Sequence, residues 1–189
     1  MNDFIPISSL NDFIFCPYSI YLHGVYSESD EEIYHAPPQT AGRLVHAGVD
    51  GKSGSTRKDD ILGLPVYSET LGVMGKIDLY RSDVHLLIER KNHLKNIYRG
   101  QLYQLWAQYF CMIEMGYLVE GIAFYEIAAN RMIPQALPTG DDRAELETFI
   151  RRFRHYNPSE DVTIPNKSKC LHCIYCNLCD RTDTENVYT

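Results

Sequence analysis

The stretch GKIDLYRSDVHLLIERK, residues 75–91, contains two strand-like apolar segments that flank the polar pair Ser82–Asp83. Two such segments around a short polar turn predict a β-hairpin, with one strand over residues 72–81 and the next over residues 84–91. The middle of the chain is therefore predicted to form part of a β-sheet.

The segments after the hairpin predict two helices and a further strand. The first helix carries apolar residues at three- and four-residue spacing, the pattern of one buried face. These residues are Leu102, Leu105, Trp106, Tyr109, Met112 and Ile113. The predicted elements are a helix over 97–117, a strand over 119–128 and an amphipathic helix over 141–156.

The segments before the hairpin are mostly helical. Residues 8–24 predict a helix with Ser8 or Ser9 as N-cap and Gly24 as its stop, and Pro17 must kink or restart it. The other predictions are an acidic irregular segment over 25–37, a helix over 38–50, a polar loop over 51–60 and a strand over 64–69. This order of elements predicts a mixed α/β fold, a small sheet flanked by helices.

The composition is that of an ordinary soluble globular protein, with 44% hydrophobic residues among 189. No apolar run approaches the roughly 18 residues of a membrane span, and the start lacks signal-peptide features, so we expect a cytoplasmic protein that uses no membrane. A net charge of −7 argues against a surface that binds nucleic acid throughout. Basic residues gather at 89–99, 151–155 and 166–169, which predicts either a local basic groove or solvated charged faces.

The hairpin also carries a candidate metal site. Glu89 and Lys91 are two residues apart and so share one face of their strand, and pairing of the strands brings Asp78 within reach of Glu89. Two carboxylates suit Mg²⁺ or Mn²⁺, and such an ion polarises a phosphodiester and activates water. The ammonium of Lys91 would orient that water or neutralise developing charge. The alternative is a set of ordinary surface charges at strand ends.

Two further features lie near this hairpin in the chain. His46 falls on the predicted helix over 38–50, where a lone histidine is usually a satisfied partner of the core or surface. Gln101, Gln104 and Gln108 form a stripe on the helix after the hairpin. They would contact phosphates or support metal ligands, or else lie on a solvated face.

The segment NKSKCLHCIYCNLCD, residues 166–180, holds four of the six cysteines of the chain. In a reducing compartment, clustered cysteines bind metal more often than they form disulfides. All four would in principle ligate one iron–sulfur cluster, although the last spacing is one residue shorter than in the ferredoxin run. A structural zinc ion is the alternative occupant. Cys111, inside a predicted helix, is expected in the core.

The succession of FCPYS, GRLVH, GKIDL, ERK, QLWAQ and CLHCIYCNLC resembles the RecB-like nucleases of the PD-(D/E)xK superfamily, and within them the CRISPR-associated exonuclease of the adaptation module, the fourth Cas protein. The resemblance implies a metal held by His46, Asp78, Glu89 and the backbone carbonyl of Arg90. It also implies catalytic roles for a further set of side chains. These are Asp78, Glu89, Lys91 and Gln104.

One departure from the family pattern concerns the helix after the hairpin. The last nuclease motif normally reads Q-x-x-x-Y, but the residue four positions after Gln104 is Gln108, and Tyr109 comes one later. The roles of Gln108 and Tyr109 therefore stay open.

The resemblance further implies a [4Fe–4S] cluster bound by Cys16, Cys170, Cys173 and Cys179, with Cys176 as an extra thiol or alternative ligand. Such a cluster would join the two ends of the chain, much as a long-range disulfide does. The implied organisation is a restriction-endonuclease-like core sheet flanked by helices, with a cysteine-rich subdomain packed on the N-terminal helix. Its parts are an N-terminal helical segment over 1–37, a nuclease core over 38–157 and the cluster segment over 158–189.

The function implied is that of a DNA exonuclease that trims single-stranded overhangs of duplex fragments before they enter a CRISPR array. Its implied partners are DNA and the integrase subunits, the first and second Cas proteins. Two alternatives from other classes remain: a non-catalytic adaptor that selects DNA fragments for the integrase, and an iron–sulfur electron carrier.

Overall fold

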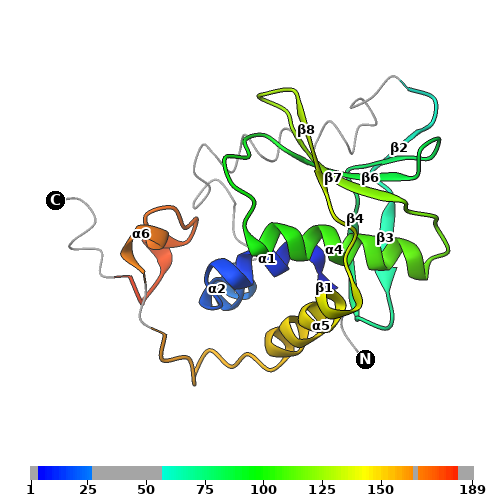
Figure 1. The fold of residues 1–189 in the computed structure, drawn as a ribbon. Helices are drawn as coiled ribbons and strands as arrows, with labels where there is room; N and C mark the ends of the chain where they lie inside the picture. The colour runs from blue at the N-terminus through cyan, green and yellow to red at the C-terminus, as the bar shows by residue number, and fades with distance from the viewer. Residues whose placement is uncertain (1–3, 27–56, 164–165, 183–189) are drawn as a thin grey trace.

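The computed structural model describes residues 4–26, 57–163 and 166–182, and its described strands form two sheets (Figure 1). The larger sheet has the order β2-β5-β6-β7-β8, and the smaller has the order β1-β4-β3. The strands of the larger sheet are β2 (Asp60–Leu62), β5 (Leu79–Arg81), β6 (Leu86–Lys91), β7 (Gly121–Glu126) and β8 (Arg131–Gln135). Those of the smaller sheet are β1 (Ile5–Pro6), β3 (Pro65–Ser68) and β4 (Val73–Lys76). The predicted mixed α/β class is confirmed.

The predicted hairpin is confirmed, but its first strand is shorter than predicted. β5 pairs antiparallel with β6, and Leu79 lies opposite Ile88. The chain that was expected to form one strand over 72–81 instead forms β4 in the smaller sheet and β5 in the larger. The break falls at Ile77 and Asp78, which are both buried, at 0% and 5% exposure. At this break the chain passes from the smaller sheet, where β4 pairs with β3, to the larger sheet, where β5 pairs with β6.

Three strands were not predicted. β1 has two residues, and β2 begins within the predicted loop over 51–60. β8 contains Pro134, which argued against a strand because proline cannot donate to a ladder. It is tolerated because β8 lies at the edge of the larger sheet. Short strands carry too few residues to show a period, which explains these omissions.

The N-terminal helix divides at Pro17, as the proline predicted. Helix α1 (Ile7–Phe15) ends at Cys16, whose backbone is extended, and α2 (Tyr18–Tyr26) starts directly after the proline. The predicted serine N-cap is wrong, because β1 leads straight into α1 and Pro6 takes the cap position without a side-chain hydrogen bond. The predicted stop at Gly24 is also wrong, since α2 continues to Tyr26.

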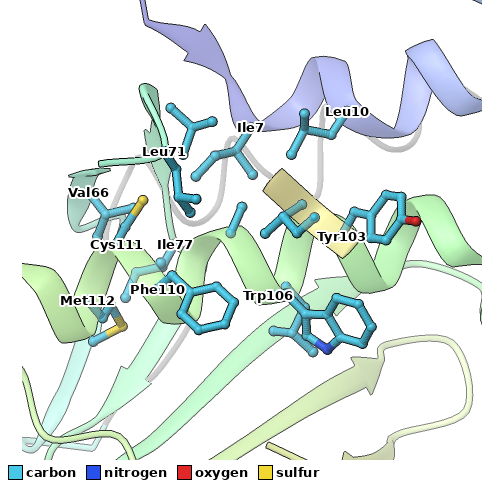
Figure 2. Packing of buried hydrophobic residues seen from close by; sticks show 14 of the residues in the cluster. Ile7, Leu10, Val66, Leu71, Ile77, Tyr103, Trp106, Phe110, Cys111 and Met112 are labelled. Atoms are coloured by element: carbon cyan, nitrogen blue, oxygen red, sulfur yellow. The ribbon is translucent and has the colours of Figure 1, made fainter. Parts of the chain in front are cut away.

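Helix α4 (Arg99–Glu114) connects the parallel pair β6 and β7 and packs between α1 and the sheets (Figure 2). Of its predicted apolar face, Leu105, Trp106 and Met112 are buried, but Ile113 is 43% exposed. Leu102 and Tyr109 are half-buried against the core. The helix is buried on a second side as well, because Gln104 and Gln108 are only 8% and 3% exposed. A solvated glutamine face is therefore wrong for these two residues.

Three further helices follow in the described part of the chain: α5 (Gly140–Arg154), α6 (Lys167–Cys170) and the short 3₁₀-helix η2 (Cys176–Leu178). The main core joins α1, α4, α5 and both sheets, and Cys111 is fully buried within it, as predicted. Burial raises the pKa of the Cys111 thiol to about 12, so this cysteine is an inert core residue at neutral pH. A separate small cluster of Tyr18, Leu22 and Tyr175 joins α2 to the cysteine segment.

No helix within the described parts of the chain combines the length and the apolar character that a membrane crossing demands. The predicted helix over 38–50 lies outside the described residues.

The close approach of α1 and α4 depends on Gly100. A Cβ at this position would lie 2.5 Å from Ile14 Cγ2 and 3.1 Å from the Asn11 backbone. We expect Gly100→Ala to reduce the free energy of unfolding by about 1–3 kcal/mol, because the two helices must separate to admit the methyl group. Urea unfolding followed by circular dichroism measures the change.

The matched control is Gly140→Ala at the start of α5, where a Cβ would meet no atom within 4 Å. This variant should unfold at or above the wild-type urea midpoint, since alanine favours the helix. Equal midpoints for Gly100→Ala and wild type would contradict the close packing of α1 on α4.

Candidate active site and cysteine pocket

A pocket of about 300 Å³ lies where the two sheets, α1 and α4 meet. Its polar lining combines acidic, basic and amide side chains from β6, α4 and the break between β4 and β5. These residues are Lys76, Asp78, Glu89, Lys91, Gln104 and Gln108. Five of them are residues that the sequence singled out, so side chains up to 30 positions apart in the chain converge on one cavity.

Asp78 and Glu89 are the two acids of this pocket, and each is 5% exposed. Asp78 comes directly before β5, so the hairpin register places it beside Glu89 and Arg90. The backbone N–H of Arg90 donates to Asp78 Oδ2 at 2.7 Å. This bond orients the Asp78 carboxylate, because an amide held in the sheet cannot move with the side chain.

Lys91 lies directly against these acids. Its Nζ is 2.8 Å from Glu89 Oε1 and 3.4 Å from Gln104 Oε1. Burial acts to lower the pKa of the Lys91 ammonium, but the carboxylates of Glu89 and Asp78 outweigh burial and raise the pKa above its ordinary value. Lys91 is therefore a cation at neutral pH, suited to stabilising negative charge.

Both glutamines of α4 hold partners in the pocket. Gln104 Nε2 donates to the carbonyl of Ser8 at 2.9 Å, which leaves Gln104 Oε1 facing Lys91. Gln108 Nε2 donates to Glu89 Oε2 at 2.8 Å. The third glutamine of the stripe, Gln101, instead accepts from the backbone N–H of Tyr98 and caps α4.

Sequence reasoning did not single out Asp12, an acid of α1 whose charge interacts with that of Lys91. Burial raises the pKa of the Asp12 carboxyl, while His23 and Lys91 act in the opposite direction. Its position one turn after Ser8 on a helix offers no signal in a single sequence, because only the packing of α1 on the sheet brings it near Lys91.

The predicted histidine ligand, His46, lies outside the described residues. Among the residues that are described, no group of three or more His, Cys, Asp or Glu side chains is placed to hold a metal ion. This pocket thus offers the carboxylates of Asp78 and Glu89 as its described acidic donors. Their hard oxygen atoms fit Mg²⁺ or Mn²⁺ in chemical type.

A second pocket, of about 340 Å³, contains most of the cysteines. It is lined by Cys16 from the end of α1 and by Cys170, Cys173 and Cys179 from the C-terminal segment. Cys176 does not line it and is buried in η2. Burial is the main cause that raises the pKa of Cys173 to about 11. These four thiols form no group placed around a single metal ion, but they fit a multi-iron group in number and type, since each cysteine of such a cluster binds a different iron.

Protein contacts alone already bind the cysteine segment to the N-terminal helices. Arg181 stacks over the Tyr18 ring at 3.7 Å and pairs with Asp161 at 2.9 Å, and Tyr18 donates to Asp180. Burial acts to raise the pKa of Asp161, but hydrogen bonds from Thr163 and a nearby Arg181 outweigh it and bring it to about 2. Asp161 is therefore ionised at neutral pH, and its pairing with Arg181 holds the cysteine segment against the rest of the chain.

A third pocket, of about 550 Å³, forms a basic groove lined by Arg99, Lys169 and His172 and by Tyr98, which is 64% exposed. None of its described lining residues is acidic. Two of the three basic clusters, 89–99 and 166–169, thus meet in space despite the negative net charge of the chain. Arg99 is paired with Glu145, while Lys169 donates to the backbone carbonyl of Phe15 at 2.9 Å and faces no acidic residue of the groove.

Comparison with known proteins agrees with the resemblance that the sequence motifs indicate. No model of a known protein family matches the chain. It is 26% identical, over 93% of its length, to a CRISPR-associated exonuclease Cas4/endonuclease Cas1 fusion from Geobacter sulfurreducens, of which it spans 33%. The chain therefore corresponds to about a third of this relative.

The fold is similar to that of the solved crystal structure of SSO0001, with a TM-score of 0.59 and 16% identity, over 95% of this chain and 87% of the other. At that identity the likeness supports the fold alone. The sequence comparison agrees with the resemblance predicted from the motifs, since over 93% of its length the chain is similar to a protein whose name includes the CRISPR-associated exonuclease Cas4.

Proposed function

We propose that this protein is a divalent-metal-dependent DNA exonuclease that trims single-stranded overhangs of duplex fragments during CRISPR adaptation. The observation that carries the proposal is the convergence of Asp78, Glu89 and Lys91 in one solvent-reachable pocket, with Lys91 Nζ 2.8 Å from Glu89. The relative described above includes an exonuclease in its name, which supports the same activity.

In this proposal Asp78 and Glu89 hold Mg²⁺ or Mn²⁺ together with the backbone carbonyl of Arg90 and with His46. When bound, the ion activates a water molecule and neutralises charge on the scissile phosphate. Lys91 stabilises the negative charge that develops at phosphorus, because it stays cationic among the acids. Gln104 holds Lys91 in place through its side-chain oxygen.

The cysteines have a structural role in this proposal. Cys16, Cys170, Cys173 and Cys179 would bind a [4Fe–4S] cluster, because these four line one pocket and Cys176 does not. The cluster would connect the segment over 1–37 and the segment over 158–189 across the nuclease core over 38–157.

Two features support DNA and the integrase as partners. The groove lined by Arg99, Lys169 and the exposed Tyr98 offers positive charge for phosphates and a ring for base stacking. The relative carries Cas4 and Cas1 in one chain. We therefore propose single-stranded overhangs as substrate, the first Cas protein as a direct partner, and the second as a member of the same assembly.

Metal removal tests the activity. The purified protein should shorten the single-stranded tail of a 3′- or 5′-tailed duplex in Mn²⁺ or Mg²⁺ and should leave it intact in EDTA, because both carboxylates need the ion to act. Tail length over time on a denaturing gel is the measurement. Tight DNA binding with an intact tail in every metal would instead support the non-catalytic adaptor.

Lys169 tests the proposed DNA contact. We expect Lys169→Gln to weaken binding of a single-stranded oligonucleotide and to lower the slope of log affinity against log salt by about 0.7, the value for one lost phosphate contact on a single strand. Fluorescence anisotropy at several salt concentrations measures both quantities. Lys58→Gln, at an exposed lysine outside the groove, is the control. A slope unchanged by Lys169→Gln would remove this lysine from the DNA path.

A further inference from the structure

Gln108 occupies the position at which the motif of the resembling family departs from its usual form. It lies on α4, one turn after Gln104, and its side chain lines the active-site pocket at 3% exposure. Tyr109 next to it packs half-buried against the core. The helix therefore directs Gln108, and not the tyrosine, at the two acids.

The amide of Gln108 holds one oxygen of Glu89 while Lys91 holds the other. Gln108 Nε2 is 2.8 Å from Oε2, and Lys91 Nζ is 2.8 Å from Oε1. An ionised carboxylate accepts hydrogen bonds but donates none, so only the NH₂ end of Gln108 can face it. The orientation of this amide is thereby determined, and its oxygen points away from Glu89.

Gln108 Oε1 is buried and makes no hydrogen bond to any described residue. Buried polar atoms in folded proteins are nearly always satisfied, and an exception marks a place where a water molecule or a ligand belongs. A tyrosine at this position would offer a single hydroxyl, whereas glutamine offers a donor and a separate acceptor.

We propose that Gln108 is a positioning residue for the divalent metal: its NH₂ group fixes the carboxylate of Glu89, and its carbonyl oxygen accepts a hydrogen bond from a water molecule bound at the metal site. This inference rests on the proposed nuclease function. Outer partners of this kind orient the ligand itself and commonly change metal affinity by about 10–100-fold when removed.

The test uses Mn²⁺ alone as probe, titrated calorimetrically into the full-length, cluster-containing protein. Gln108→Met keeps the size of the side chain but removes both polar groups. It should raise the Mn²⁺ dissociation constant about 10–100-fold. DNA cleavage should fall most at low Mn²⁺ and recover in part at saturating Mn²⁺. Gln101→Met, the same change two turns earlier on α4, should leave the dissociation constant unchanged.

A Gln108→Met protein that folds and binds Mn²⁺ within twofold of wild type would overturn the inference. If this variant does not fold, Gln108→Asn takes its place, since it keeps an amide that is one methylene too short to reach Glu89. The same criterion then applies to it. Asp78→Asn distinguishes failure of the proposed metal site from failure of the role of Gln108. If Asp78→Asn binds Mn²⁺ as wild type does, the pocket is not the metal site. If Asp78→Asn loses Mn²⁺ binding while Gln108→Met binds normally, the metal site stands and only the role of Gln108 is contradicted.

Discussion

Replacing Lys91 with alanine is expected to lower the rate of DNA cleavage at saturating Mn²⁺ by about 10²–10³-fold, the usual loss when one group that stabilises the transition state is removed. Lys91 is the cation that contacts Glu89 and Gln104 in the pocket, and the neighbouring acids keep it charged. Mn²⁺ binding should persist, because both carboxylates remain and lose a competing positive charge. Single-turnover cleavage of a tailed duplex measures the first effect, and calorimetric titration measures the second.

The matched control is Lys95→Ala, which removes an exposed lysine four positions later. It should cleave at the wild-type rate. Glu89→Ala should lose both cleavage and Mn²⁺ binding, in contrast to Lys91→Ala. If Lys91→Ala digested the tail as fast as Lys95→Ala, the pocket would not be the catalytic centre.

Replacing Cys16 with serine is expected to remove the iron and its visible absorption from anaerobically purified protein, although 154 positions separate Cys16 from Cys170. The reason is that Cys16 lines the same pocket as Cys170, Cys173 and Cys179. Loss of a cross-link over so long a segment should reduce stability on the order of 4 kcal/mol. That corresponds to a fall of roughly 10 °C in the unfolding temperature. Iron analysis, absorption spectra and a thermal melt measure these effects.

Cys176→Ser is the matched comparison, because Cys176 lies in the same motif but outside the pocket. It should keep its iron and spectrum. The reverse outcome, with iron lost from Cys176→Ser and kept by Cys16→Ser, would assign the cluster to the four C-terminal cysteines. If the wild-type protein contains one equivalent of zinc and shows no visible absorption band, the cysteines form a zinc site and not an iron–sulfur cluster.

Much of the fold could be predicted from local pattern. The hairpin, α4 and α5 are long enough to show a period, and Pro17 marks a helix break by its own chemistry. The strands that were missed have two to five residues, or carry a proline that only an edge position allows. The division of the predicted strand over 72–81 was not visible either, because which sheet a residue joins depends on partners distant in the chain.

In the candidate site, too, some contacts could be predicted from the sequence and others depend on tertiary packing. Glu89 and Lys91 are two residues apart on one strand, and the hairpin brings Asp78 opposite them, so strand geometry alone predicted that the three side chains meet. The roles of Gln108 and Asp12 depend on how α4 and α1 pack on the sheets, and no spacing rule reports that contact. His46 remains a prediction, since it lies outside the described residues.

By itself, the sequence determined which residues are candidates for chemistry: the pair of acids with a lysine, the glutamines on one helix, and five cysteines in two motifs. Residue type and short-range period settle these matters because they depend on covalent geometry over a few residues. Only the tertiary structure decided which groups share a pocket, namely Gln108 with Glu89 and Cys16 with three of the four C-terminal cysteines. The physical reason is that burial and hydrogen bonding act across space, between segments whose separation along the chain sets no limit on their contact.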